Sequence, residues 1–268
     1  MNFANKTKKD IKRMQAALKA DGSDPGPIDG IAGPLTKAAA SRWEAEIASW
    51  ARGIDVSSYQ TLIDWQKVAA NGVSFVIARA SVSIYRDKLF EAHIAGAKAA
   101  GLLVGAYHFF APWRSVTTQV ELILSQMNLA LDLPFVLDVE ALAPKPMKGA
   151  PLPVPVSKLQ LIQRTAACLQ QLELRLGKRP TLYTYSAFDQ EYNLGATFGR
   201  DYHLHIADYR EGPPTISAAW GSYAFHQYAG NGGRQLGVTG PCDLDVFRGS
   251  KDQLLAFCAL SKAAILAW

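Results

Sequence analysis

From residue 52 onward the sequence alternates between short apolar segments and longer amphipathic ones, and this alternation constrains the fold more than any other feature. Segments rich in β-branched and aromatic residues are predicted as strands over residues 75–79, 103–109, 135–138, 181–185 and 203–207. Helical periodicity lies between them, including residues 90–100, 116–131 and 156–176. Alternation of this kind predicts an α/β fold built on a parallel sheet or barrel.

Two carboxylates end the third predicted strand. Residues 134–140 read Pro-Phe-Val-Leu-Asp-Val-Glu, so one residue separates Asp138 from Glu140. Alternate residues of a strand point to the same face, and two residues span roughly 6–7 Å. Both acids therefore face one site, where like charges raise one pKa and leave a proton donor beside an ionised partner. Glycosidic hydrolysis needs this combination, although a solvated strand end carrying two acids is an alternative interpretation.

Other polar residues follow the predicted strands at the same end. In parallel α/β folds, functional residues gather at the carboxyl ends of the strands. Tyr107 and His108 come near the end of one strand and Asp208 follows another, so we expect them near the two acids. Residues 141–155 carry five prolines and predict a long irregular loop suited to a groove wall. No glycine-rich phosphate-binding motif follows a strand, so nucleotide binding has no support.

The composition excludes several other kinds of site. The 268 residues are 49% hydrophobic, which suits one large domain or one domain with a small module. The net charge is only +5, and no basic block is interleaved with aromatic residues, so we expect no nucleic-acid partner. Cys168, Cys242 and Cys258 are widely spaced and form neither a zinc-ligand pattern nor a complete disulfide framework. We therefore expect no metal and no cofactor.

The sequence also shows no pattern typical of a signal peptide or a membrane span. Residues 1–20 are too polar for a signal peptide, and no stretch approaches the roughly 18 apolar residues of a membrane span. The apolar segment 260–268 is too short to anchor stably in a membrane. We expect a monomer that is synthesised in the cytoplasm and that another factor must deliver to any target outside it.

The chain divides near residue 50. Residues 6–22 and 35–50 have helical periodicity, and residues 24–34 between them are dense in Gly, Pro and Asp. We predict a small all-α module over residues 1–50 and a larger domain over residues 51–268. With Asp-Gly at 29–30 and Gly-Pro-Leu-Thr at 33–36, the module resembles the small peptidoglycan-binding module of many cell-wall hydrolases. A helical lead-in without a ligand is the alternative.

Four separated motifs of the larger domain resemble glycoside hydrolase family 25, the muramidases also called Chalaropsis-type lysozymes. The motifs are Gly-Ile-Asp-Val-Ser-Ser-Tyr-Gln at 53–60, Gly-Ala-Tyr-His-Phe at 105–109, Asp-Val-Glu at 138–140, and Gly-Pro-Cys-Asp-Leu-Asp-Val-Phe at 240–247. The resemblance covers about residues 52–250. It implies a modified (β/α) barrel of about five βα units finished by antiparallel strands. It also implies cleavage of the β-1,4 bond between N-acetylmuramic acid and N-acetylglucosamine in peptidoglycan.

The resemblance implies catalytic roles for four acids. Glu140 matches the general acid, and Asp138 matches the second acid of the same motif. Asp55 and Asp243 match two further acids that line the groove. Asp138 could form a covalent intermediate, or it could orient the substrate N-acetyl group as the nucleophile, and the sequence leaves both routes open.

Five further residues are candidates for substrate contact. Tyr107, Tyr185 and Gln227 lie in segments that match the family. Asp208 is added because it follows a strand, and Trp113 because its apolar face suits stacking against a sugar ring. These residues would line the groove around the acids.

Three positions depart from the family pattern. Residues 80–83 read Ala-Ser-Val-Ser where the family has a T-E-G-like turn, and His205 and His226 replace expected aromatic residues. The departures keep open a catalytically weak peptidoglycan-binding protein on the same fold. A chitinase-like hydrolase is a narrower alternative. A wall peptidase or amidase would need a zinc set or a Cys/His pair, which the sequence lacks.

The order of the two predicted domains suggests a biological setting. A wall-binding module followed by a muramidase domain, without a signal peptide, resembles a phage or prophage endolysin. Such a protein would act on the bacterial cell wall after a holin opens the membrane. A bacterial autolysin exported by another route is the rival interpretation.

Overall fold

The computed structural model describes residues 1–145, 154–230 and 232–263, with side chains to residue 259. Most of the proline-rich segment predicted as a groove wall, residues 146–153, lies outside the described residues, as does the end of the apolar segment at 264–268. Within the part of the chain that is described, no helix combines the length and apolarity needed to cross a bilayer.

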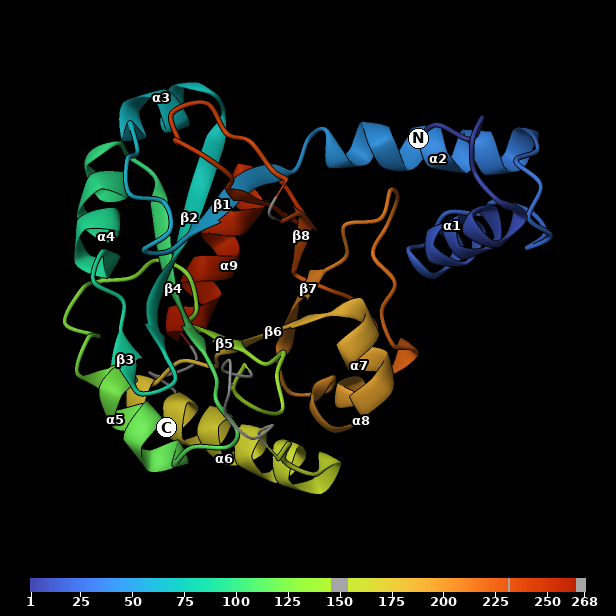
Figure 1. Cartoon of the computed structure of the whole chain (residues 1–268). Coiled ribbons are helices and arrows are strands. Elements are labelled where there is room, and N and C mark those ends of the chain that lie inside the picture. The colour runs from blue at the N-terminus through green and yellow to red at the C-terminus, as the bar shows by residue number, and fades with distance from the viewer. Residues whose placement is uncertain (146–153, 231, 264–268) are drawn as a thin grey trace.

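Eight strands close into a barrel (Figure 1). In their order around the barrel they are β1 (Ala51–Val56), β2 (Val73–Val82), β4 (Leu103–Phe109), β5 (Val136–Asp138), β6 (Thr181–Tyr185), β7 (His203–Ala207), β8 (Phe225–Ala229) and β9 (Asp243–Phe247). β1 closes the ring by pairing with both β2 and β9. Neighbours from β1 to β8 run parallel, whereas β9 is antiparallel to both of its partners. A short β3 (Tyr85–Arg86) extends β2 as a hairpin outside the ring.

Helices cover the outside of the barrel and connect successive strands. They are α3 (Trp65–Ala70), α4 (Phe90–Ala99), α5 (Val116–Leu124), α6 (Lys158–Leu176), α7 (Ser186–Tyr192), α8 (Leu194–Phe198), the 3₁₀ turn η1 (Ala218–Trp220) and α9 (Lys251–Ala263). An α-helix follows β1, β4, β5 and β6 directly and follows β2 after the short β3, which confirms the expected modified (β/α) barrel of about five βα units. The antiparallel finish of the ring is the single strand β9.

The helix predicted over residues 116–131 is too long, because α5 ends at Leu124. The Ser125 hydroxyl donates to the Leu122 carbonyl, and the next two N–H groups bond three residues back rather than four. These shorter turns take the chain out of α-helical geometry before the segment that leads into β5. Apolar periodicity continued through this region, so the pattern alone did not show the stop.

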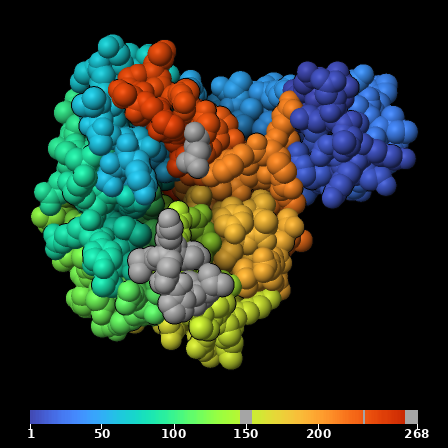
Figure 2. Space-filling view, viewed as in Figure 1, coloured from blue at the N-terminus to red at the C-terminus, as the bar shows by residue number. Residues whose placement is uncertain are grey.

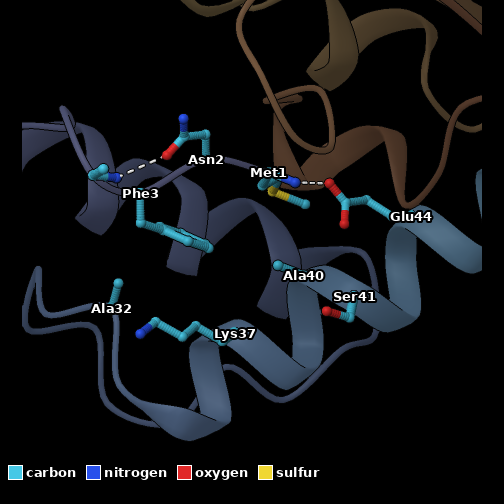
Figure 3. A pocket seen from close by; sticks show the side chains of 9 residues that line it. Met1, Asn2, Phe3, Ala32, Lys37, Ala40, Ser41 and Glu44 are labelled. Atoms are coloured by element: carbon cyan, nitrogen blue, oxygen red, sulfur yellow. Dashed lines mark hydrogen bonds and ion pairs between the residues drawn. The ribbon is translucent and has the colours of Figure 1, made fainter.

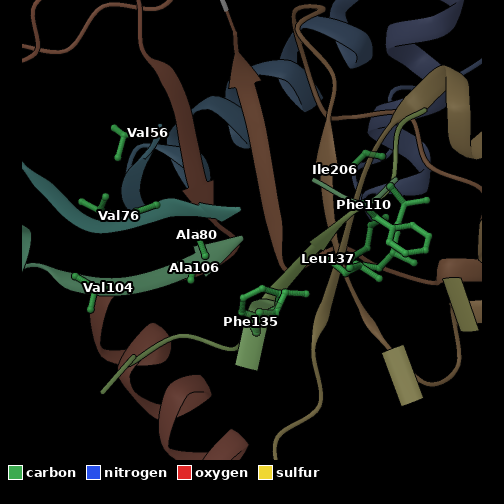
Figure 4. Packing of buried hydrophobic residues seen from close by; sticks show 14 of the residues in the cluster. Val56, Val76, Ala80, Val104, Ala106, Phe110, Phe135, Leu137 and Ile206 are labelled. Atoms are coloured by element: carbon green, nitrogen blue, oxygen red, sulfur yellow. The ribbon is translucent and has the colours of Figure 1, made fainter. Parts of the chain in front are cut away.

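Alternation along the strands separates two apolar clusters. Val76, Val104 and Leu137 point outward and pack with residues of the covering helices (Figure 4). Residues on the other face of the strands point inward and form a second cluster inside the barrel, which includes Phe75 and Phe225. Gly53 leaves room for this filling, since a Cβ there would lie 2.2 Å from the Phe75 ring. The barrel interior is therefore a packed core at this level, not a channel.

The first 50 residues form a small helical unit beside the barrel (Figures 1 and 2). α1 (Lys8–Ala20) and α2 (Pro34–Ile47) pack through a core that includes Leu18 and Trp43. Gln15 is buried between them, donates to Asp29 and Thr36, and accepts the Gly30 N–H at 2.9 Å. One amide side chain thus fixes the glycine-rich loop between the helices.

A hollow of about 670 Å³ lies in this unit, between the N-terminal segment and α2 (Figure 3). Phe3, Lys37, Ala40 and Glu44 are among the residues that line it. None of the four acids predicted to be catalytic lines this hollow. It belongs to the small unit and is separate from the barrel chemistry.

Candidate active site

The four predicted acids meet at one end of the barrel. Asp55 lies near the carboxyl end of β1, Asp138 ends β5, and Glu140 follows it by two residues. Asp243 begins β9, and because β9 is antiparallel, its first residue lies at the end where the parallel strands finish. Asp55 and Asp243 are direct partners in the register of β1 with β9. The fold thus brings together acids that are far apart in sequence.

The carboxyl groups of Asp55 and Asp243 are hydrogen-bonded to each other. Burial raises the pKa of Asp55 well above its ordinary value, and the nearby charges of Asp245 and Asp243 raise it further. Burial and Asp245 also raise the pKa of Asp243, to about 6. The Gln227 amide donates to the other side of Asp55. Because two adjacent buried carboxylates cannot both ionise cheaply, the pair holds one proton.

Asp138 and Glu140 form the second pair of acids. Burial raises the pKa of Asp138 well above its ordinary value, and Glu140 adds to this while Arg79 opposes it. Burial also raises the pKa of Glu140, with Lys145 opposing and the charge of Asp243 adding. Glu140 is half-buried, whereas Asp138 is buried. The Glu140 carboxyl is therefore within reach of a substrate, and its raised pKa favours the protonated form that a general acid needs.

One carboxylate oxygen of Asp138 has no partner. Its Oδ1 is buried and makes no hydrogen bond to any described residue. Buried polar atoms are usually satisfied, so an unsatisfied one calls for an explanation. An oxygen left free beside a proton donor is suited to face a positive charge that develops on a substrate.

Tyrosines and Gln227 tie the acids to neighbouring strands. The Tyr183 and Tyr209 hydroxyls donate to Gln227 Oε1 over 3.0 and 2.6 Å. Tyr107 is half-buried on β4, and burial followed by the charge of Asp55 raises the pKa of its hydroxyl well above the ordinary value. Tyr185 is 39% exposed, with a pKa raised by burial and then by Glu140. Three of the predicted contact residues, Tyr107, Tyr185 and Gln227, therefore surround the acids.

Asp208 is placed differently from the other predicted contact residues. Its carboxylate accepts from the Arg210 guanidinium over 2.7 and 2.6 Å, and also from Ser186 and the Thr215 N–H. Burial opposes ionisation, but these bonds hold the pKa of Asp208 below its ordinary value. Asp208 thus fixes the loop after β7. Trp113 lies half-buried between β4 and α5, and its contact with substrate stays a prediction.

The three departures from the family pattern each have a local partner. The Ser81 hydroxyl lies 2.7 Å from Nδ1 of His108, which points away from the acids and has its pKa lowered by burial to about 4. His205 Nε2 lies 2.9 Å from Asp245 Oδ1, one layer beneath the Asp55–Asp243 pair. His226 Nε2 lies 2.9 Å from the Asp208 carbonyl. These substitutions are accommodated by hydrogen bonds within the barrel wall.

Sequence reasoning missed several residues of this site, chiefly Tyr183, Tyr209, Arg79 and Asp245. Two of them carried a usable signal. Tyr183 lies two residues before Tyr185, and Asp245 lies two residues after Asp243, so each shares a strand face with a residue that was chosen. Tyr209 sits in a loop, where no periodicity applies.

The fold and the site define a class of enzyme. Paired acids at the carboxyl end of a (β/α) barrel, one of them a half-buried carboxyl group with a raised pKa, are the arrangement of a glycoside hydrolase. The model of the glycosyl hydrolases family 25 matches residues 54–235. The chain therefore belongs to family 25.

Individual relatives agree with this assignment. YegX of Escherichia coli (strain K12), an uncharacterized protein, is 33% identical over 76% of this chain and 72% of its own length. An autolytic lysozyme of Clostridium acetobutylicum is 30% identical over 73% of this chain and 55% of its own length. The crystal structure of a bacterial lysozyme from Streptomyces coelicolor is similar with a TM-score of 0.70 and 27% identity, covering 80% of this chain and 99% of that one.

Proposed function

We propose that this glycoside hydrolase is an N-acetylmuramidase that cleaves the β-1,4 bond between N-acetylmuramic acid and N-acetylglucosamine in peptidoglycan. The observation that carries the proposal is the half-buried Glu140, with a raised pKa, beside Asp138 on a family 25 barrel. Peptidoglycan is the substrate class because the relatives with described activities are lysozymes and a diacetylmuramidase.

Glu140 acts as the general acid. Burial and the charge of Asp243 raise its pKa, which favours the protonated form that can protonate the glycosidic oxygen as the bond breaks. The Glu140 carboxylate then takes a proton from the incoming water, which completes the exchange and restores the acid. The half-exposed position of Glu140 allows both transfers.

Asp138 stabilises the positive charge that develops on the sugar ring. Its free Oδ1 makes no bond that would have to break first. Burial and the charge of Glu140 raise the pKa of Asp138 while Arg79 lowers it, so a proton on Glu140 favours the ionised form of Asp138 that stabilises this charge. The proton-sharing Asp55–Asp243 pair and Gln227 form the opposite wall and hold the groove in one shape. Tyr107 and Tyr185 supply ring faces for the sugars.

The direct test is digestion of purified peptidoglycan, followed by borohydride reduction and mass spectrometry of the products. Reduced muramic acid ends are expected. Reduced glucosamine ends would make the enzyme a glucosaminidase, and release from chitin oligomers would favour the chitinase-like alternative. If the protein binds the wall and releases nothing, the peptidoglycan-binding alternative replaces this proposal.

We extend the proposal to the small unit, residues 1–50, as a wall-binding module in a phage or prophage endolysin. Support comes from its separate core of Leu18, Ala39 and Trp43 and from its resemblance to wall-binding modules. Pull-down of the full chain and of a chain lacking residues 1–50 on insoluble peptidoglycan tests the binding role. A holin gene beside this one would support host lysis, whereas an isolated housekeeping locus would favour an autolysin.

A further inference from the structure

The short segment from Asp208 to Gly212, which follows β7, reaches the acid site at one end. The Tyr209 hydroxyl donates to Gln227 Oε1 over 2.6 Å, and Gln227 in turn donates to Asp55. The Tyr209 ring lies against Gly230, where a Cβ would approach its Cζ atom to 2.7 Å. Tyr209 is nevertheless 57% exposed, so one face of its ring is open to a ligand.

Two residues later the same segment contacts the N-terminal unit. Glu211 Oε1 accepts the Asn2 N–H over 2.7 Å, and Oε2 lies 2.9 Å from Lys6 Nζ. The Arg13 guanidinium donates to the Glu211 carbonyl over 2.5 Å. Figure 2 shows the N-terminal unit touching the barrel over this part of the chain. Glu211 thus receives contacts from two separate parts of the unit, the N-terminal segment and α1.

The segment between Tyr209 and Glu211 is held firmly. Asp208 binds the side chain and the N–H of Arg210, and its other oxygen accepts the Thr215 N–H over 2.9 Å. Arg210 is bound to Asp208, so Tyr209 lies between a part of the chain bound within the barrel and Glu211, which is bound to the N-terminal unit. The contacts of Glu211 therefore restrain the chain two residues after Tyr209.

A second contact between the unit and the barrel lies elsewhere. Asp21, at the end of α1, accepts from the Tyr223 hydroxyl over 3.2 Å and pairs with Arg248 at 3.0 Å. Neither Tyr223 nor Arg248 belongs to the segment that carries Tyr209. Of these two polar contacts between described residues, the one at Glu211 lies on the segment that carries Tyr209.

We propose that the N-terminal unit, besides any contact it makes with the wall, positions Tyr209 in the substrate groove through Glu211. Glu211 is thus a positioning residue, and Tyr209 is a further residue that contacts the sugar chain. This inference rests on the proposed hydrolysis of peptidoglycan glycan chains. It makes the unit part of the substrate site of the barrel.

The test compares Glu211→Ala with the matched variant Asp21→Ala in the full chain, using a soluble muramic acid-containing tetrasaccharide too short to reach both domains. Glu211→Ala should raise KM about two- to fivefold with kcat little changed, as expected from the loss of a few exposed polar contacts. Asp21→Ala should leave KM unchanged. In a Tyr209→Ala background, Glu211→Ala should add no further increase.

Equal increases from both docking variants, or no increase from Glu211→Ala, would overturn the inference. Hydrogen exchange of the amides at 208–212 gives a readout that does not need activity. Exchange should quicken in Glu211→Ala and stay unchanged in Asp21→Ala, and equal exchange in both would also overturn it. If the wild-type protein releases no products, the proposed function is rejected. The exchange data would still test whether Glu211 holds the segment at 208–212 in place.

Discussion

The two ends of the barrel interior are built from the same strands and the same alternation, yet they hold opposite chemistry. At one end Phe225 and Phe247 are directly paired in register, with Ala51 beside them. At the other end the corresponding positions are Asp55 and Asp243. The change takes place within four residues of β1 and four of β9, so the backbone geometry is common to both ends.

The difference shows where stability is gained and where it is given up. The apolar end buries aromatic rings in edge contacts, such as Phe75 with Phe225 at 5.5 Å between ring centroids. The acidic end buries carboxyl groups whose raised pKa values show that their ionised forms are disfavoured there. The apolar end therefore stabilises a site that would not stabilise itself.

The largest expected effect on folding comes from the apolar end. Phe75→Ala removes a fully buried ring beneath Asp55 and should lower the free energy of unfolding by about 3–5 kcal/mol. Denaturant unfolding measures this. Activity per folded molecule should change much less than the free energy of unfolding. If activity fell as strongly as stability, the apolar end would be needed for catalysis as well as for folding. Leu174→Ala, at an exposed position of α6, is the control and should change stability little.

At the acidic end, by contrast, a substitution is expected to raise the free energy of unfolding. Because the pKa of Asp243 is raised to about 6, the folded state loses stability as pH rises from about 4 through 6, where the unfolded chain ionises first. Asparagine cannot ionise, so Asp243→Asn should gain about 1–3 kcal/mol at pH 7 and nothing below about pH 3.5. Thermal unfolding across pH checks this against Asp252→Asn on the surface of α9. A variant destabilised at pH 7 would contradict the comparison.

The smallest expected effect concerns the proton on Glu140. The charge of Lys145 lowers the pKa of this acid, so Lys145→Met should let Glu140 keep its proton to higher pH. The alkaline limb of the activity profile should move up by roughly a few tenths of a pH unit, because a partly solvated charge is screened. The shift should shrink at high salt. A downward shift would show that another group controls that limb.

Much of the barrel could be predicted from the sequence. The bounds of β4, β6 and β7 match the predicted strands, since each is a short apolar run with clear alternation. The convergence of the acids followed from the rule that functional residues gather at strand ends, together with the family resemblance. The predicted length of α5 was wrong, because the helix ends at Leu124, where the next residue, Ser125, bonds back to the Leu122 carbonyl.

The remaining features depend on contacts that no local pattern encodes. Asp55 and Asp243 share a proton only because β9 runs antiparallel beside β1. Asp208 was expected to contact substrate, yet its carboxylate is engaged by Arg210, which follows it by two residues. The contacts of Asn2 and Lys6 with Glu211, close to Tyr209, join parts of the chain that are far apart in sequence, so no local pattern encodes them.

The most direct test of the central claim is the initial rate of peptidoglycan solubilisation by wild type and Glu140→Gln at matched thermal stability. If Glu140 is the general acid, the variant should lose about 10²–10⁴-fold in rate while still binding the wall. A variant that keeps a tenth or more of the wild-type rate would contradict the account. That result would mean that another of the four acids is the proton donor.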